Sequence, residues 1–150
     1  MAVVLDLSNR ELVGWSIKLR MTADIVADAL NMAWFRRRPA PELIHHSDQG
    51  SQYASHLFQA KPAAHHMICS MSGKGNCWDN APTESFFISL KNEWVRGTRY
   101  ATRDDAIADL FDYIEVFYNR SRRHSTLDYR SPIQFLHSWI SNQPEQKLAA

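Results

Sequence analysis

Short strand patterns alternate with helical patterns over the first half of this chain, and that order restricts the fold more than any other feature. Residues 2–7 and 11–19 are predicted to form a hairpin, because β-forming residues flank a turn at residues 8–10. Apolar residues then recur on one helical face over 23–37, with Thr22 as the expected N-cap. The chain therefore opens with a β-hairpin followed by a helix.

The next segment repeats the alternation of strand and helix. Residues 43–46 are predicted to form a short strand that ends just before a polar loop. A helix is expected over 53–60 and is expected to end at Pro62, since proline lacks the N–H that a helix interior needs. Residues 65–70 are predicted to form a further short strand.

The second half of the chain has mainly helical patterns. After the glycine-containing loop at residues 72–76, a helix is predicted to start near Pro82, with Asn80 as candidate cap. The most regular amphipathic pattern starts after Thr102 and reaches Tyr118. Ser131 is predicted to cap a final short helix that reaches about residue 140.

Composition is that of an ordinary globular protein. The chain has 150 residues, of which 45% are hydrophobic and 22% charged, enough for one domain with a real core. No apolar run approaches membrane-spanning length, and no secretory signal is recognisable at the amino terminus. Cys69 and Cys77 do not make a disulfide framework, which favours a reducing cytoplasm.

A net charge of only +1 argues against coating nucleic acid by bulk charge, although basic residues are locally concentrated. They gather at residues 36–38 and in a second group that contains Arg120, Arg122, Arg123 and His124. Such a group can bind DNA phosphates. The alternative is that these arginines form a solvated surface and partly stabilise a helix carboxyl terminus.

Two carboxylates lie in settings that suit a metal ligand, with 35 residues between them. Asp48 follows a strand in the string HHSDQGSQY (residues 45–53), and Glu84 lies at the expected start of a helix. An isolated aspartate of this kind can simply cap the next helix, and first-turn glutamates are common because the helix dipole favours them. Two carboxylates from different elements can also hold a divalent ion for phosphodiester chemistry.

Three segments resemble the integrase core of bacterial insertion-sequence transposases, a family related to retroviral integrases. They are residues 44–53, residues 70–93 and residues 117–132. The resemblance implies an α/β, ribonuclease-H-like fold with a mixed sheet flanked by helices. It also implies that Asp48 and Glu84 are the second and third members of a catalytic triad that binds Mg²⁺ or Mn²⁺.

The family's first strand, with its first aspartate, has no match in this sequence. Asp6 matches a structural aspartate of the hairpin instead. We therefore expect a partial catalytic core over residues 1–140, a polar tail over 141–150, weak cation binding and little activity of the chain alone. A sheet without that central strand is also expected to aggregate or to borrow a strand.

The resemblance further implies DNA contacts around the carboxylates. We expect contacts from Lys74 and Asn76 in the loop before the helix that starts near Pro82, from Lys91 two turns after Glu84, and from the arginine and histidine group at 120–124. Lys91 could equally be a solvated lysine, and the loop a plain surface loop. His45 and His46 are disfavoured as paired zinc ligands, since neighbouring strand residues point to opposite faces.

The expected function is metal-dependent DNA cleavage and strand transfer in transposition, in the bacterial cytoplasm at the nucleoid. The expected partners are transposon ends and target DNA, together with a homo-oligomer or a full-length transposase. One alternative is a non-catalytic DNA-binding or self-associating remnant. Another is a ribonuclease-H-like nuclease unrelated to transposition.

Overall fold

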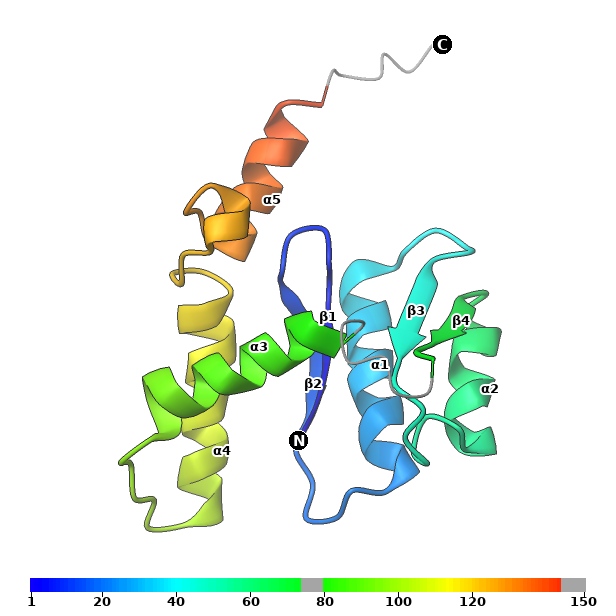
Figure 1. Cartoon of the computed structure of the whole chain (residues 1–150), viewed down its shortest axis with the longest axis horizontal. Coiled ribbons are helices and arrows are strands. Elements are labelled where there is room, and N and C mark those ends of the chain that lie inside the picture. The colour runs from blue at the N-terminus through cyan, green and yellow to red at the C-terminus, as the bar shows by residue number, and fades with distance from the viewer. Residues whose placement is uncertain (74–79, 144–150) are drawn as a thin grey trace. The chain divides into compact units, whose positions relative to one another are not determined.

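The computed structural model describes residues 1–73 and 80–143, which form two compact units (Figure 1). The first unit comprises residues 1–6 and 12–99, and the second comprises residues 7–11 together with the chain from residue 100 onward. Strands occur only in the first unit among the described residues. The second unit contains helices and the tip of the hairpin.

The predicted hairpin is confirmed. Strand β1 (Ala2–Leu5) pairs antiparallel with β2 (Leu12–Ser16), and the register places Val4 opposite Gly14. Helix α1 (Ala23–Arg37) packs against both strands with its predicted apolar face. The buried residues of that face are Ile25, Val26, Ala27, Ala29, Leu30 and Ala33.

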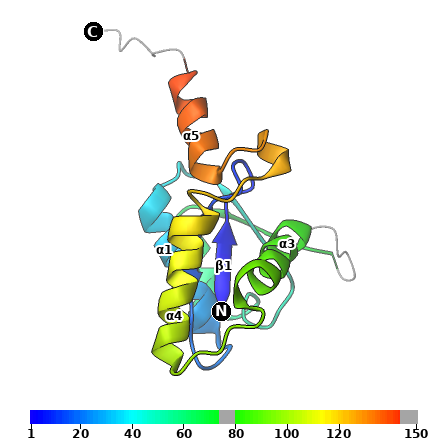
Figure 2. The ribbon, with the colours of Figure 1, turned by 90° about the vertical axis from the view of Figure 1, so that its left-hand side faces the viewer.

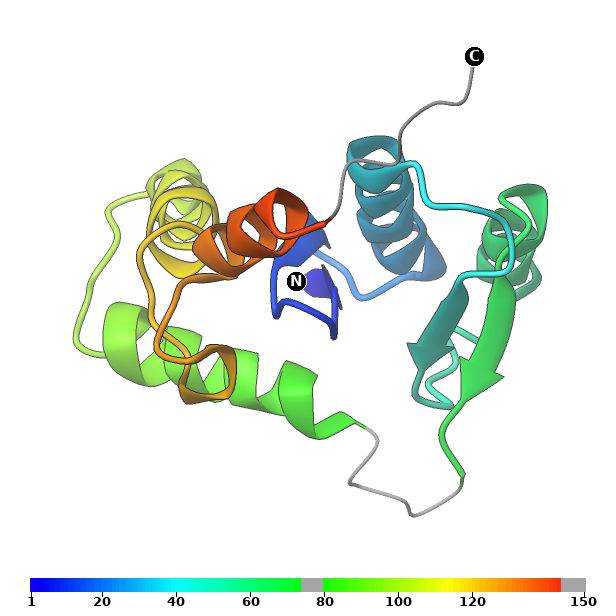
Figure 3. The same ribbon diagram turned by 90° about the horizontal axis from the view of Figure 1, so that it is seen from above.

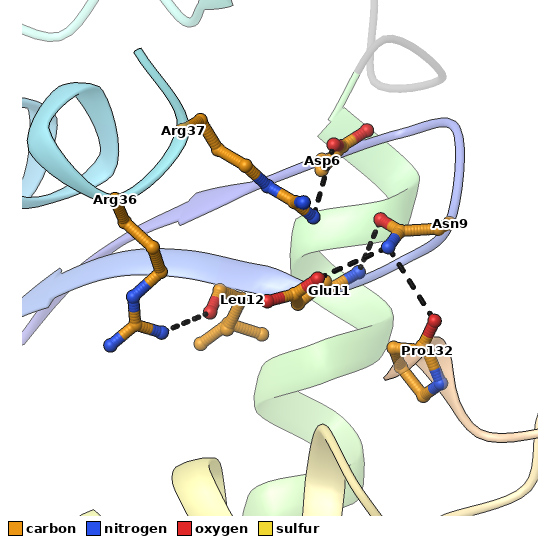
Figure 4. Close-up of polar contacts among 7 residues, drawn as sticks. All are labelled: Asp6, Asn9, Glu11, Leu12, Arg36, Arg37 and Pro132. Carbon is orange, nitrogen blue, oxygen red and sulfur yellow. Dashed lines mark hydrogen bonds and ion pairs between the residues drawn. The ribbon is translucent and has the colours of Figure 1, made fainter. Parts of the chain in front are cut away.

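Polar contacts stabilise the two ends of α1. Thr22 occupies the predicted N-cap position, but its hydroxyl bonds to the Asp24 side chain and makes no capping bond to the backbone. At the other end, Arg37 Nη2 lies 3.5 Å from Asp6 Oδ2, and Arg36 donates to the carbonyl oxygen of Leu12 across 3.3 Å (Figure 4). Asp6 therefore has the structural role in the hairpin that the sequence predicted.

The strand–helix–strand segment forms a parallel pair. Strand β3 (Ile44–Ser47) pairs in register with β4 (Ile68–Met71), and α2 (His56–Ala64) connects them (Figure 3). The predicted helix is present, but its predicted bounds of 53–60 and its predicted end at Pro62 were wrong. Ser55 accepts a hydrogen bond from the Phe58 N–H, so the helix starts later, and Pro62 is buried in its last turn.

The strands form two separate two-stranded sheets among the described residues. β1 pairs only with β2, and β3 pairs only with β4. One pair is antiparallel and the other parallel, which is the mixed character that the sequence predicted. Each pair therefore has two outer backbone edges, one on each strand, that have no hydrogen-bonded strand within residues 1–73 and 80–143.

Helix α3 (Ala81–Leu90) follows Asn80, as predicted, and continues into a π-helical segment, η2 (Lys91–Val95). Phe86 and Leu90 are buried, whereas Phe87 and Trp94 are half-buried. The apolar side of α3 is thus buried, and the helix contacts β1 of the first unit.

The second unit is built around one long helical stretch. Helix α4 (Arg103–Asp112) runs directly into the π-helical segment η3 (Tyr113–Tyr118), and a 3₁₀ turn, η4 (Ser125–Leu127), precedes α5 (Pro132–Ser141) (Figure 2). Thr102 and Ser131 each form the reciprocal capping box with the residue three positions on. Both predicted helix starts are confirmed.

The hairpin tip belongs to this second unit through Asn9, which is 1% exposed. Its amide nitrogen donates to Glu11 Oε2 across 3.1 Å and lies 3.5 Å from the carbonyl oxygen of Pro132 (Figure 4). Its amide oxygen accepts the Glu11 N–H across 3.2 Å. The predicted turn at residues 8–10 thus carries a buried polar side chain whose amide nitrogen and amide oxygen are both hydrogen-bonded.

Candidate functional site

Asp48 lies one residue beyond the carboxyl end of β3 and is exposed. Its Oδ1 accepts the backbone N–H of Gly50 across 2.7 Å. The carbonyl oxygen of Gly50 in turn accepts the N–H groups of Tyr53 and Ala54 across 2.9 and 3.1 Å. The carboxylate is therefore attached to a hydrogen-bonded turn, and its remaining lone pairs are available to a cation.

Tyr53 is an aromatic neighbour of this turn. Its ring packs edge-on against Phe58 with centroids 5.2 Å apart, beside the apolar core of the first unit. Burial raises the pKa of the Tyr53 phenol, and the negative charge of Asp48 raises it further. Because both effects have the same sign, Tyr53 remains a neutral hydroxyl beside the carboxylate.

The two strand histidines face different surroundings, as the sequence predicted. The ring of His45 lies 5.5 Å from that of Phe58, and burial lowers the pKa of His45. His46 contacts two hydroxyls instead, with Nδ1 3.0 Å from Ser70 Oγ and Nε2 3.0 Å from Ser72 Oγ. His46 thus connects the end of β3 to β4 and to the residue that follows β4.

Ser72 completes this connection. It is 4% exposed, and its N–H donates to the Ser47 carbonyl oxygen across 2.9 Å. The parallel pairing therefore continues past Met71, directly beside the residue that precedes Asp48. The sequence predicts a polar surface loop at Ser72. Its burial and its bond to His46 depend on the pairing of β3 with β4, two strands that are more than twenty residues apart in the sequence.

Glu84 lies in the first turn of α3 and is exposed. The amino-terminal end of α3 is directed toward the carboxyl end of β3 in two perpendicular views (Figures 1 and 3). Asp48 thus follows the strand end toward which α3 is directed, and Glu84 lies in the first turn of that helix. Two exposed carboxylates are the oxygen ligands that Mg²⁺ and Mn²⁺ take, so the chemistry of the donors fits such an ion.

No three His, Cys, Asp or Glu side chains in residues 1–73 and 80–143 are grouped closely enough to hold a metal ion together. Asp48 and Glu84 are therefore not part of a larger group of such side chains within the described residues. Mg²⁺ keeps several of its waters when bound, so two carboxylates can hold it, although weakly.

The other residues predicted near the carboxylates are only partly described. Lys91 is exposed and is the first residue of η2, one helical stretch with Glu84. π-Helical turns of this kind often occur at functional sites. Lys74 and Asn76 lie outside the described residues, so their predicted DNA contacts remain predictions.

The predicted basic group lies in the second unit and divides into two kinds of side chain. Arg120 and Arg123 are exposed. Arg122 is half-buried, with its guanidinium 5.6 Å from the centre of the Tyr118 ring and Nη1 3.4 Å from His124. The His124 ring also packs edge-on against Tyr118 at 5.0 Å. Arg120 and Arg123 are thus more accessible to phosphate than Arg122 and His124.

Sequence reasoning misses two residues beside Asp48 as functional candidates. The sequence indicates Gly50 only as a residue that lets the backbone turn, and Tyr53 only as the end of the polar string. The short spacing from Asp48 is the available signal for Gly50, since side-chain to backbone turns span two residues.

None of the helices in the described part of the chain combines the length and apolar character that crossing a bilayer demands.

Comparison with known families gives two matches along the chain. A family model described as an integrase core domain matches residues 1–77, and a second model with the same description matches residues 84–138. The first match covers more than half of the chain. It includes the segment around Asp48, whereas Glu84 is the first residue of the second match.

Curated relatives come from bacterial insertion sequences. The chain is 48% identical over 135 residues to the transposase InsF of insertion sequence IS3A from Escherichia coli, covering 90% of this chain and 47% of that protein. It is 45% identical over 135 residues to an uncharacterised 31 kDa protein of insertion element IS600 from Shigella sonnei, covering 90% and 50%. The chain spans about half the length of these relatives.

Solved structures with a similar fold are retroviral. The catalytic core domain of BIV integrase superposes with a TM-score of 0.58 at 17% identity, covering 84% of this chain and 78% of that chain. A chain of the simian T-cell lymphotropic virus intasome gives a TM-score of 0.60 at 16% identity, covering 86% and 43%. At these identities the comparison shows the fold alone, and it confirms the predicted ribonuclease-H-like class.

Proposed function

Because this chain belongs to the integrase core domain family of bacterial insertion-sequence transposases, we propose that it supplies two carboxylates of a site that cleaves and joins DNA. Asp48 and Glu84 are the proposed metal ligands. The substrate would be DNA at transposon ends and at a target, and the place of action the bacterial nucleoid.

The placement of the two carboxylates is the main support for this function. Asp48 is exposed at the carboxyl end of β3, with its carboxylate bonded to the Gly50 N–H, and the exposed Glu84 starts the helix whose amino-terminal end is directed toward β3. Ligand-binding residues commonly follow the carboxyl ends of parallel strands. Helix amino termini also favour negative charge, which suits both Glu84 and a phosphate group.

The side chains of this chain would hold the metal ion and orient the DNA phosphate. A bound Mg²⁺ or Mn²⁺ ion would stabilise charge on the phosphate and lower the pKa of an attacking water or 3′-hydroxyl. Asp48 and Glu84 would ligate that ion through carboxylate oxygens. Lys91 would hold a DNA phosphate on the same side of the helix as Glu84, since seven residues make about two turns.

We further propose that the chain alone binds the ion weakly and has little activity. No group of three His, Cys, Asp or Glu side chains that could hold a metal ion occurs in residues 1–73 and 80–143, so Asp48 and Glu84 are the two ligands that we propose from this part of the chain. With two carboxylates in place of three, the site has less negative charge and one fewer fixed oxygen ligand. Water must then fill that coordination position of Mg²⁺. Full activity would then need a partner, either a homo-oligomer or a full-length transposase.

A Mn²⁺-binding measurement tests the proposed site independently of turnover. Mn²⁺ titration followed by electron paramagnetic resonance should give weak binding by the unaltered chain and weaker binding by Asp48→Ala and Glu84→Ala. Asp112→Ala is a matched control, because Asp112 is an exposed carboxylate in the second unit. Absence of binding at millimolar Mn²⁺, or binding that ignores both substitutions, would overturn the proposal.

A nicking assay with Mg²⁺ or Mn²⁺ on supercoiled DNA then tests the reaction itself. Any activity should disappear in Asp48→Ala and in Glu84→Ala and persist in Asp112→Ala. Nicking that survives both active-site substitutions would show that another group, or a contaminating nuclease, performs the chemistry.

The exposure of Arg120 and Arg123 supports a second candidate function, DNA binding without catalysis. On this alternative, the chain would bind duplex DNA with equal affinity with or without Mn²⁺, and Asp48→Ala would bind as well as the unaltered chain. Electrophoretic mobility shifts with and without Mn²⁺ separate the two functions.

A further inference from the structure

We propose that Gly50 is a positioning residue for Asp48: the absence of a side chain at Gly50 is what allows the Asp48 carboxylate to keep its orientation toward a divalent cation. The proposal rests on the proposed metal role of Asp48. The hydrogen-bonded turn of residues 48–54 is the observation that supports the positioning role. This role of Gly50 goes beyond letting the backbone turn.

Gly50 contacts the carboxylate directly. Its N–H donates to Asp48 Oδ1 across 2.7 Å, a short distance for a bond between a backbone amide and a carboxylate oxygen. This bond fixes one carboxylate oxygen and so the direction in which the remaining lone pairs point. Partners that orient a metal ligand in this way commonly set metal affinity.

Space at Gly50 is too small for a side chain. A Cβ atom placed on Gly50 would lie 2.8 Å from Asp48 Oδ1, which is closer than real Cβ contacts. It would also lie 3.1 Å from Gln52 Oε1 and 3.5 Å from Tyr53 Cδ2. The tightest of these approaches is therefore to the carboxylate.

Backbone conformation gives no separate reason for glycine at position 50. Gly97 is the glycine with positive φ among the described residues, so Gly50 does not adopt the left-handed conformation that disfavours other residues. Alanine could take the same backbone angles at position 50. The requirement for glycine is thus the space beside the carboxylate and not the turn geometry.

The backbone that follows Gly50 is held by side-chain hydrogen bonds. Gln52 Nε2 donates to the Met21 carbonyl oxygen across 3.1 Å, and Gln59 Nε2 donates to the Tyr53 carbonyl oxygen across 2.7 Å. Ser55 Oγ also donates to the Gln52 carbonyl oxygen across 2.7 Å. These three bonds restrict movement of the turn on the carboxyl-terminal side of Gly50.

A side chain added at Gly50 would therefore displace the Asp48 carboxylate and leave the backbone in place. The carboxylate is exposed, so its rotation into solvent costs little folding energy. We expect Gly50→Ala to fold normally. In this variant the Asp48 carboxylate would be rotated away from the orientation in which it binds the cation. Loss of metal affinity without loss of stability would be the signature of positioning.

Two other glycines provide matched controls for this substitution. At Gly73, an added Cβ meets nothing within 4 Å, so Gly73→Ala should change neither stability nor Mn²⁺ binding. At Gly14, an added Cβ would lie 2.1 Å from the Ala29 carbonyl oxygen, a backbone atom, so Gly14→Ala should lower stability. Together the three alanine variants separate a folding effect from a carboxylate effect.

The experiment measures Mn²⁺ affinity by electron paramagnetic resonance and thermal unfolding by circular dichroism for each variant. Gly50→Ala should bind Mn²⁺ about tenfold more weakly, in the range typical when a group that orients a metal ligand is removed, with an unchanged unfolding temperature. Unaltered Mn²⁺ affinity would overturn the proposal. A fall in unfolding temperature as large as that of Gly14→Ala would also overturn it, because the effect would then be structural.

A double-substitution cycle shows whether Gly50 acts through Asp48. The variant with both Gly50→Ala and Asp48→Ala should bind Mn²⁺ no more weakly than Asp48→Ala alone, because the group that Gly50 positions is already gone. Additive losses of affinity would contradict positioning. If Asp48→Ala itself leaves Mn²⁺ affinity unchanged, the proposed metal site fails. If only Gly50→Ala is without effect, the positioning role alone fails.

Discussion

The N–H of Gly50 and the Oδ1 of Asp48 are 2.7 Å apart, and a Cβ on Gly50 would lie 2.8 Å from the same oxygen. One backbone position thus both supplies a hydrogen bond to the carboxylate and leaves it room. On the aromatic side of the same turn, Asp48 acts electrostatically on Tyr53. The charge of the Asp48 carboxylate can therefore be followed through the titration of Tyr53.

The phenol of Tyr53 should titrate at lower pH when the charge of Asp48 is removed. Burial is the first cause that raises the pKa of Tyr53 and Asp48 the second, so Asp48→Asn should lower that pKa only in part. Ultraviolet titration of tyrosinate, assigned with Tyr53→Phe, measures the change. Asp112→Asn should leave the titration as it is, and an equal shift in that control would contradict the argument.

The same raised pKa predicts how stability depends on alkaline pH. The unfolded chain loses the Tyr53 proton near the ordinary pKa of 10.0, whereas the folded chain keeps it to higher pH. The stability that this group contributes is complete below that value and falls as pH rises through the folded pKa. Tyr53→Phe should therefore flatten the alkaline part of a plot of unfolding free energy against pH, as measured by urea unfolding.

Replacement of Gly14 should destabilise the first unit. An added Cβ would lie 2.1 Å from the Ala29 carbonyl oxygen and 2.8 Å from Ala33, both on α1, where the backbone cannot rotate away. Gly14→Ala is expected to cost about 1–3 kcal/mol, as overpacking usually does. Urea unfolding compared with Gly73→Ala measures this cost, and equal stability of the two variants would be the contrary result.

Removal of the Asn9 amide should destabilise the second unit. Asn9 is 1% exposed and bonds to Glu11 and to the Pro132 carbonyl oxygen, so Asn9→Ala leaves buried polar groups without these bonds. The expected cost is about 1–3 kcal/mol. Asn92→Ala removes an exposed amide and should cost far less. Comparable destabilisation by the two substitutions would show that the buried bonds contribute little.

The arginines of the second unit should differ in what their removal changes. Arg120→Ala with Arg123→Ala should weaken DNA binding and reduce the salt dependence of log affinity by about one for each phosphate that is no longer neutralised. Arg122→Ala should instead lower the unfolding temperature, because its guanidinium lies over Tyr118. Fluorescence anisotropy at several salt concentrations measures the first effect and circular dichroism the second, with exposed Arg103→Ala as the charge control.

The strand edges left open on the two strand pairs predict self-association. Exposed edges offer unpaired N–H and C=O groups, and Ile44 on β3 is also 64% exposed. Light scattering should show concentration-dependent association of the chain, reduced in Ile44→Lys because an edge charge opposes pairing. A soluble monomer with a cooperative thermal melt would contradict this expectation.

Features that depend on near neighbours in the sequence were predicted well. Thr102 and Ser131 start helices because their hydroxyls bond to backbone groups three residues away, and both capping boxes are present. The hairpin and α1 follow from apolar periodicity. Asp48 was correctly predicted to follow a strand, because the apolar run and the polar string meet there.

Features that depend on distant segments were decided by the tertiary structure. His46 bonds to Ser70 and Ser72, which lie 24 and 26 residues away, and strand register determines those partners. Pro62 was expected to end a helix, yet it is buried in the last turn of α2, where packing and the Ser55 cap outweigh its missing N–H.

The sequence by itself thus determined the order of the main elements and the family, and it is the source of the prediction that Asp48 and Glu84 are ligands. The folded chain decided which groups surround them. Gly50 illustrates the physical reason: its backbone conformation would suit many residues, and only the position of the Asp48 oxygen after folding excludes a side chain there. Steric exclusion of this kind depends on atoms that meet in space, and a linear pattern of residue types does not specify it.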